Sequence, residues 1–78
     1  MVTPESIEQS IRAGLACERV EVVGDGQHFQ AVVVSGQFTG KSRIQRHQLV
    51  YAALGERMRE EIHALSMRTL TPEEWKRG

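Results

Sequence analysis

The sequence predicts an α+β fold in which helices cover one face of a three-stranded mixed sheet. Two periodicities support this prediction, because apolar residues recur every three or four positions in some segments and every second position in others. A third observation concerns strand direction: the last strand-like segment follows the second one only after a helical stretch, which favours a parallel pair. We therefore expect the order helix, strand, strand, helix, short helix, strand, helix, within one domain at residues 1–78.

The N-terminal segment is typical of an amphipathic helix. Thr3 suits the N-cap position, and Pro4 follows it where a missing backbone N–H costs nothing. The apolar positions recur at every fourth residue: Ile7, Ile11 and Leu15. We expect this helix to end near Cys17.

Three segments have the composition and the period of strands. Residues 19–23 alternate valine with charged residues and predict a half-buried first strand. The Gly-Asp-Gly sequence at residues 24–26 favours a tight turn, because glycine reaches positive φ without strain. Residues 29–35 then predict a second strand, rich enough in valine to be the central one. Residues 64–70 alternate again and predict the third strand.

A second helix is predicted after a loop at residues 36–40, with Ser42 as its N-cap. Its apolar stripe consists of Leu49, Val50, Ala53 and Leu54. Gly55 is placed to end this helix. Residues 58–62 continue the apolar spacing and predict a short further helix.

The C-terminal residues predict a short capped helix. Thr71 suits the N-cap, Pro72 the first helical position, and the side chain of Glu74 can reach back to the cap. Trp75 is expected to anchor this helix in the core.

Composition excludes several classes of protein. Ten basic and ten acidic residues give a formal net charge of zero, which weighs against a phosphate-driven nucleic-acid binder. The apolar runs are far shorter than the ~20 residues that a membrane-spanning helix needs, and the first residues show no secretory-signal pattern. The single cysteine, Cys17, cannot form an internal disulfide, so a cytoplasmic location is expected.

Two histidines precede strands that we expect to run parallel. His28 lies just before the second strand and His63 just before the third. Adjacent parallel strands begin at one edge of a sheet, ~4.8 Å apart, so the two imidazoles could converge on one metal centre. The alternative is that each is a polar strand-end residue facing water. His47 lies on a helix away from both, and we interpret it as a surface residue or a partner contact.

The number of donors limits what such a centre could be. A structural zinc site needs four cysteine or histidine ligands, and the chain has no C-x-x-C motif and one cysteine. An iron–sulfur cluster also needs four ligands, and mixed histidine and cysteine ligation of clusters exists. A metal centre in this chain would therefore have to be shared with a partner.

A local basic cluster occupies the start of the second helix. Its members are Lys41, Arg43, Arg46 and His47. It could contact phosphates or an acidic patch on a protein, or simply form a solvated face. No serine, histidine and acid arrangement has a supporting context, so we expect no enzymatic activity.

Three segments together resemble the BolA family. They are residues 38–54, residues 62–65 with the sequence Ile-His-Ala-Leu, and residues 69–75 with the sequence Thr-Leu-Thr-Pro-Glu-Glu-Trp. The resemblance covers nearly the whole chain and implies a class II KH-like fold. It also implies a non-enzymatic role in iron–sulfur metabolism, in which a complex with a monothiol glutaredoxin shares a [2Fe–2S] cluster for assembly, trafficking or iron sensing.

The resemblance also implies the cluster ligands. His63 matches the family's signature histidine, and His28 matches the histidine in the loop between the first two strands. The remaining two ligands would be the glutaredoxin's active-site cysteine and a glutathione thiol, so the isolated protein would hold no cluster. The short Gly-Asp-Gly-Gln-His-Phe form of the loop resembles the bacterial IbaG branch.

A second implication of the resemblance is DNA binding by a transcriptional regulator of the stress or morphology type, since residues 43–47 match the region proposed for DNA contact in some members. Two departures weigh against it. Gly36 and Gly40 are one residue too far apart for the G-x-x-G loop of nucleic-acid-binding KH modules, and Gln48 stands where many members carry arginine. A third alternative is an apo protein, a monomer or weak homodimer, that acts through protein contact alone.

Overall fold

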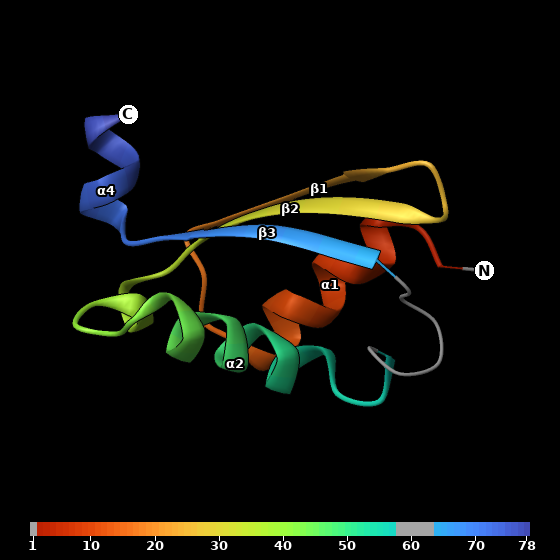
Figure 1. Ribbon diagram of the computed structural model, residues 1–78, viewed down its shortest axis with the longest axis horizontal. Coiled ribbons are helices and arrows are strands. Elements are labelled where there is room, and N and C mark those ends of the chain that lie inside the picture. The colour runs from red at the N-terminus through yellow and green to blue at the C-terminus, as the bar shows by residue number, and fades with distance from the viewer. Residues whose placement is uncertain (1, 58–63) are drawn as a thin grey trace.

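The computed structural model describes residues 2–57 and 64–78 and contains the expected α+β elements (Figure 1). The bounds of the elements are α1 Pro4–Gly14, β1 Arg19–Gly24, β2 His28–Val34, the 3₁₀ turn η1 Gly36–Phe38, α2 Arg43–Leu54, β3 Ala64–Leu70 and α4 Pro72–Arg77. The short helix expected at residues 58–62 lies outside the described residues. Within the two described ranges, no helix is long and apolar enough to cross a membrane.

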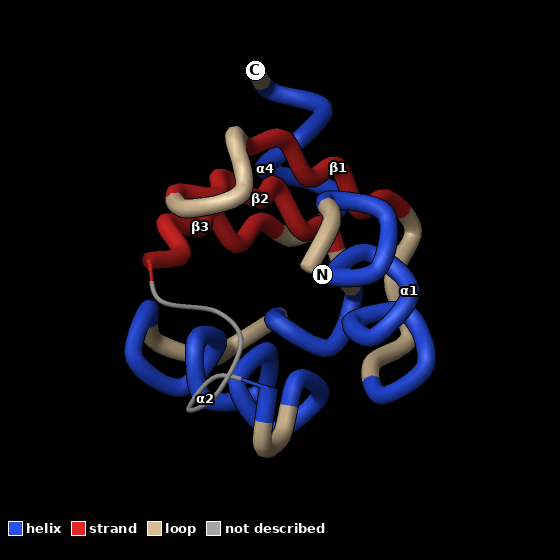
Figure 2. The backbone as a smooth tube through the Cα atoms, turned by 90° about the vertical axis from the view of Figure 1, so that its right-hand side faces the viewer, coloured by secondary structure: helices blue, strands red, loops and turns tan. Residues whose placement is uncertain are grey.

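The sheet has three strands in the spatial order β1-β2-β3. β1 and β2 form an antiparallel hairpin, and β3 runs parallel to β2, as the helical stretch between them predicted. Helices α1 and α2 lie on the same face of the sheet, whereas α4 continues beyond the end of β3 (Figure 1, Figure 2). The prediction of a mixed three-stranded sheet covered on one face is confirmed.

The core forms where the two long helices meet the central strand. From β2, the side chains of Phe29, Ala31 and Val33 are at most 2% exposed. The other buried members of this cluster are Ile7, Ile11, Leu15, Val20, Phe38, Val50 and Leu54. On α2 the predicted stripe is only partly buried, because Leu49 and Ala53 pack at the margin of the cluster. The central position predicted for β2 is confirmed by this burial on its helical face.

Each α-helix of the described residues begins with a capping box. The N-caps are Thr3, Ser42 and Thr71. Each cap hydroxyl accepts the backbone N–H three positions on, and the side chain at that position accepts the N–H of the cap. The predicted pairing of Thr71 with Glu74 is confirmed. Helix α1 ends at Gly14, before the predicted end near Cys17, because Leu15 adopts extended backbone with φ −150° and ψ 127°.

The prediction that Trp75 anchors α4 in the core is wrong. Its side chain is 39% exposed, and α4 contributes no buried residue. The indole ring packs instead against the guanidinium group of Arg19 on β1, whose Cζ lies 4.9 Å from the ring centroid. Helix α4 extends past the end of β3 (Figure 1), and none of its six residues, four of them charged, is buried.

Candidate metal centre and basic surface

Strands β2 and β3 begin side by side at the same end of the sheet. In their parallel register His28, the first residue of β2, lies opposite Ala64, the first residue of β3. Paired strands stand ~4.8 Å apart. His63 lies outside the described residues and is joined to Ala64 by one peptide bond. The common edge expected for the two strand starts is confirmed, and ligation by His28 and His63 stays a prediction.

The loop before β2 is ordered around Asp25. Its Oδ1 accepts the backbone N–H groups of His28 and Gln27, each at 2.9 Å. These two bonds stabilise the ionised carboxyl and lower the pKa of Asp25, and the bond from the His28 N–H contributes most. Gly26 supplies the φ of +98° at the turn. The loop therefore fixes the backbone of His28 and places a carboxylate close to it.

The imidazole of His28 is exposed, whereas the next residue, Phe29, is buried in the core. Within the described residues no hydrogen bond involves the His28 ring, so its nitrogens are accessible to an external ligand. Imidazole nitrogen is a suitable donor for iron. In the described ranges, no three histidine, cysteine or acidic side chains are grouped so that they could hold a metal ion.

Cys17 lies at the opposite end of the sheet from His28. Its neighbour Glu18 donates a backbone hydrogen bond to Val34, the last residue of β2, whereas His28 is the first. The Sγ of Cys17 donates to the carbonyl of Leu15 at 3.2 Å, and burial raises the pKa of the thiol. The structure therefore brings no cysteine to the end of the sheet where His28 lies.

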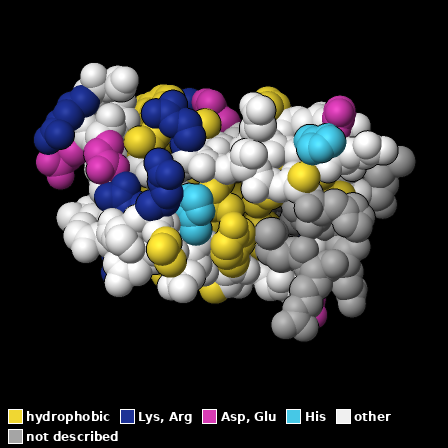
Figure 3. Space-filling view, in the orientation of Figure 1, with side chains coloured by type: hydrophobic (Ala, Val, Ile, Leu, Met, Phe, Trp, Pro, Cys, Tyr) yellow, Lys and Arg dark blue, Asp and Glu magenta, His cyan; other side chains and the backbone are white. Residues whose placement is uncertain are grey.

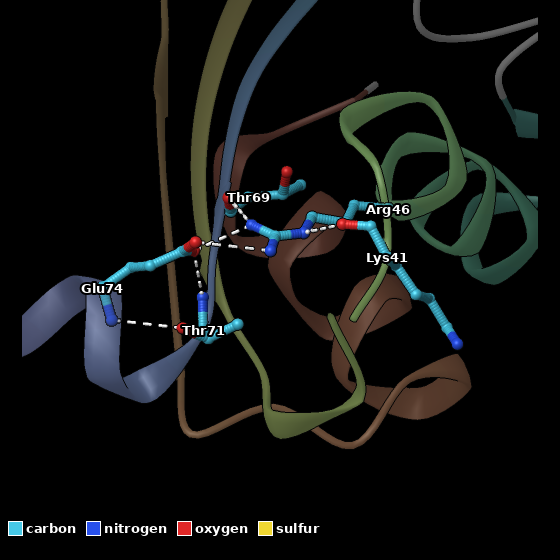
Figure 4. Close-up of polar contacts among 5 residues, drawn as sticks. All are labelled: Lys41, Arg46, Thr69, Thr71 and Glu74. Carbon is cyan, nitrogen blue, oxygen red and sulfur yellow. Dashed lines mark hydrogen bonds and ion pairs between the residues drawn. The ribbon is translucent and has the colours of Figure 1, made fainter. Parts of the chain in front are cut away.

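Arg46 forms a polar cluster between α2 and α4 (Figure 4). Its Nη1 and Nη2 donate to the two carboxylate oxygens of Glu74 at 2.8 and 3.3 Å. Nη1 also donates to the carbonyl of Thr69 at 3.1 Å, and Nε donates to the carbonyl of Lys41 at 3.0 Å. The hydrogen bonds from Arg46 and from the Thr71 N–H lower the pKa of Glu74 to about 2, and the contribution of Arg46 is the larger. Most donors of this predicted contact residue are thus used within the protein.

The other members of the predicted basic cluster differ from Arg46. Lys41 and Arg43 are exposed, and their charged groups contact no carboxylate in the described part of the chain. His47 is half-buried, and its ring makes a T-shaped contact with the ring of Tyr51, with 6.3 Å between the centroids. Figure 3 shows the two described histidines well apart, one of them beside basic side chains. His47 is therefore separate from the strand edge at His28.

The ion pair between Arg46 and Glu74 was not predicted from the sequence. Glu74 was expected only as the third helical residue of a capping box, and Arg46 as a member of a basic cluster available to a partner. The two residues are 28 positions apart, and no periodicity or local motif links them. The capping box itself was the one available signal, because it fixes the carboxylate of Glu74 beside the end of β3.

These observations define a small α+β protein with a mixed three-stranded sheet, two helices on one face and an exposed histidine at the start of the central strand. A family model described as "BolA-like protein" matches residues 2–74. The chain therefore belongs to the BolA family, whose proteins are non-enzymatic. The resemblance found in the sequence is confirmed at this level.

Several relatives are similar over most of their length. The chain is 46% identical to Protein BOLA2 of Arabidopsis thaliana, over 97% of this chain and 86% of that one. It is 40% identical to the acid stress protein IbaG of Escherichia coli K12 (91% and 86%), and 35% identical to the DNA-binding transcriptional regulator BolA of the same organism (96% and 81%). IbaG is thus one of several comparably similar relatives. A solved BolA homologue from Coxiella burnetii matches with a TM-score of 0.89 and 49% identity, over 97% of this chain and 99% of that one.

Proposed function

We propose that this protein shares a [2Fe–2S] cluster with a monothiol glutaredoxin, and that His28 and His63 are the two ligands it supplies. The active-site cysteine of the glutaredoxin and a glutathione thiol supply the other two. The cluster is cargo in this proposal, so the protein acts in cluster assembly, trafficking or iron sensing without catalysing a reaction.

The observation that carries the proposal is the parallel register of β2 and β3. It aligns His28 with Ala64, the residue that follows His63 in the sequence. A [2Fe–2S] cluster takes four ligands, and two imidazoles leave two positions for a partner. The exposure of His28 supports the proposal further, because a second protein can reach its ring without unfolding the core.

The test is a spectral titration. A monothiol glutaredoxin loaded with a [2Fe–2S] cluster and glutathione is mixed with this protein, and visible absorption and circular dichroism are recorded. We expect a spectral change when histidine replaces a thiolate ligand, and we expect His28→Ala and His63→Ala each to abolish it. His47→Ala is the matched control, because it removes an imidazole on α2, and it should retain the change.

The pH dependence gives a second readout. Protons compete with iron for the imidazole nitrogen, so the spectral change should weaken as the pH is lowered. His28→Ala should keep the unfolding midpoint in urea close to that of the wild type, because the removed side chain is exposed. If His28→Ala and His63→Ala are both folded and both give the wild-type spectral change, the ligand assignment is wrong.

A DNA-binding regulator remains the second candidate. It is favoured by the relative named as a DNA-binding transcriptional regulator and by the exposed cations Lys41 and Arg43. Its signature is an affinity for duplex DNA that falls steeply with salt and is lost when both charges are reversed. Weak, salt-independent binding to DNA would exclude it.

A further inference from the structure

The side of α2 that faces away from the core carries two large exposed apolar side chains. Ile44 is 70% exposed and Tyr51 is 41% exposed. Gln48, also exposed, lies between them at the spacing that puts all three on one face of a helix. Grouped apolar side chains, unlike single scattered ones, indicate an interaction surface. Figure 3 shows hydrophobic side chains next to basic ones on this side of the molecule.

The N-terminal end of this face is positively charged and uncompensated. Lys41 and Arg43 are exposed and make no ion pair with any described residue. The first turn of α2 contains no acidic residue. The positive end of the helix dipole adds to the same potential. The charge of this surface therefore suits a partner that carries carboxylates.

From these two features we propose that α2 presents a docking surface for an acidic amphipathic segment of a partner protein. The docking surface consists of Lys41, Arg43, Ile44, Gln48 and Tyr51. Apolar side chains of the partner cover Ile44 and Tyr51, while its carboxylates pair with Lys41 and Arg43. The proposal goes beyond cluster sharing, because no residue of this surface is a proposed cluster ligand.

The structure favours a protein partner here over nucleic acid. Arg46 at the start of α2 is held by Glu74, so among the described residues of this surface Lys41 and Arg43 are the two cations left for phosphates. The formal net charge of the chain is zero, and nucleic-acid affinity depends on the number of phosphates neutralised. The uncharged part of the surface carries the two large apolar side chains of Ile44 and Tyr51, and protein interfaces combine such apolar contacts with a charged rim.

The test uses a designed probe of defined chemistry. A fluorescein-labelled helical peptide with leucine on one face and glutamate on the other is titrated with the protein, and fluorescence anisotropy gives the Kd. We expect Ile44→Asp, and separately the double variant Lys41→Glu with Arg43→Glu, to weaken binding by about tenfold or more. Added salt should weaken it as well. A peptide with lysine in place of glutamate should not bind.

Matched variants elsewhere on the surface control for charge and hydrophobicity. Val23→Asp replaces another exposed apolar residue, 62% exposed on β1, with the same acid. Lys76→Glu with Arg77→Glu reverses two exposed charges on α4. Both controls should bind the acidic peptide with wild-type affinity, and circular dichroism confirms that every variant is folded.

Three outcomes would overturn the proposal. The first is equal weakening by the α2 variants and their controls. The second is binding of the lysine peptide as tightly as the glutamate peptide. The third is tight binding of a short DNA duplex through Lys41 and Arg43 with no binding of the acidic peptide. His28→Ala should leave peptide affinity unchanged, so failure here is distinguishable from failure of the cluster proposal.

Discussion

Arg46 shows how a single side chain can look like a contact residue in the sequence and serve the fold in the structure. Its side chain is 14% exposed, and its guanidinium group joins α2 to both β3 and α4. The same group lies over the ring of Phe38, with Cζ 5.9 Å from the ring centroid. We expect Arg46→Ala to cost on the order of 1–2 kcal/mol of unfolding free energy.

The partner of Arg46 predicts how stability changes in acid. The pKa of Glu74 is about 2 in the folded protein, against the ordinary value of 4.5. The ionised carboxylate therefore stabilises the fold above pH 4.5, and this contribution is lost as the pH falls from 4.5 towards 2, because the unfolded chain takes up the proton first. The urea midpoint of the wild type should fall over this range, and that of Glu74→Gln should fall less.

Glu73→Gln is the control for the acid experiment, because it removes an adjacent carboxylate that is not part of the ion pair. Its midpoint should follow the wild-type curve. If Glu74→Gln loses stability as steeply as the wild type between pH 4.5 and 2, the ion pair does not contribute to acid stability.

Gly24 allows a close approach in the hairpin beside the proposed ligand. A Cβ there would lie 2.5 Å from the carbonyl oxygen of His28 and 2.5 Å from Cδ1 of Phe29. Gly24→Ala should therefore lower the unfolding free energy by about 1–3 kcal/mol, measured by urea denaturation. Gly36→Ala is the control, since a Cβ there meets nothing within 4 Å, and it should leave stability equal or slightly higher. Equal effects of the two substitutions would contradict this packing argument.

At the scale of the elements, the helix caps and the strand pairing could be predicted from the sequence, because local motifs and chain connectivity determine them. Capping residues such as Ser42 and Thr71, and the parallel pairing of β2 with β3, follow from short motifs and from chain connectivity. The proximity of His28 to the start of β3 could therefore be predicted from the sequence alone. The exposure of Trp75 and the role of Arg46 depend on where α4 lies relative to the sheet, and no local pattern encodes that position.

The contact between α1 and α2 depends on a small residue. A Cβ on Gly14 would lie 2.8 Å from both Cα and Cβ of Ala53. Gly14→Ala should force the helices apart and cost about 1–3 kcal/mol. Because Ala53 contributes part of the clash, Ala53→Gly should partly rescue the Gly14→Ala variant, and a double-mutant cycle from urea unfolding should give a nonzero coupling energy. Strictly additive effects of the two substitutions would show that the helices do not meet there.

At the scale of the whole molecule, the proposed cluster ligand His28 and the start of α2 lie at opposite ends of the strands. The proposed cluster ligand His28 begins β2, and six steps of ~3.3 Å place the other end of that strand roughly 20 Å away. The start of α2 lies at that other end, because Arg46 donates to Thr69 near the end of β3. The N-terminal part of the docking surface, at Lys41 and Arg43, is therefore far from His28, and we expect it to stay accessible when a partner binds at His28.

This separation predicts that the two binding events are independent. Ile44→Asp should leave the spectral change with cluster-loaded glutaredoxin intact, and His28→Ala should leave the affinity for the acidic peptide intact. Substitutions that share no contact partners contribute additively, so the double variant should lose both activities, each to the extent seen in its single variant. Titration of all four proteins with both ligands measures this. A loss of the cluster signal in folded Ile44→Asp would mean that the glutaredoxin itself covers α2, and that the two surfaces form one interface.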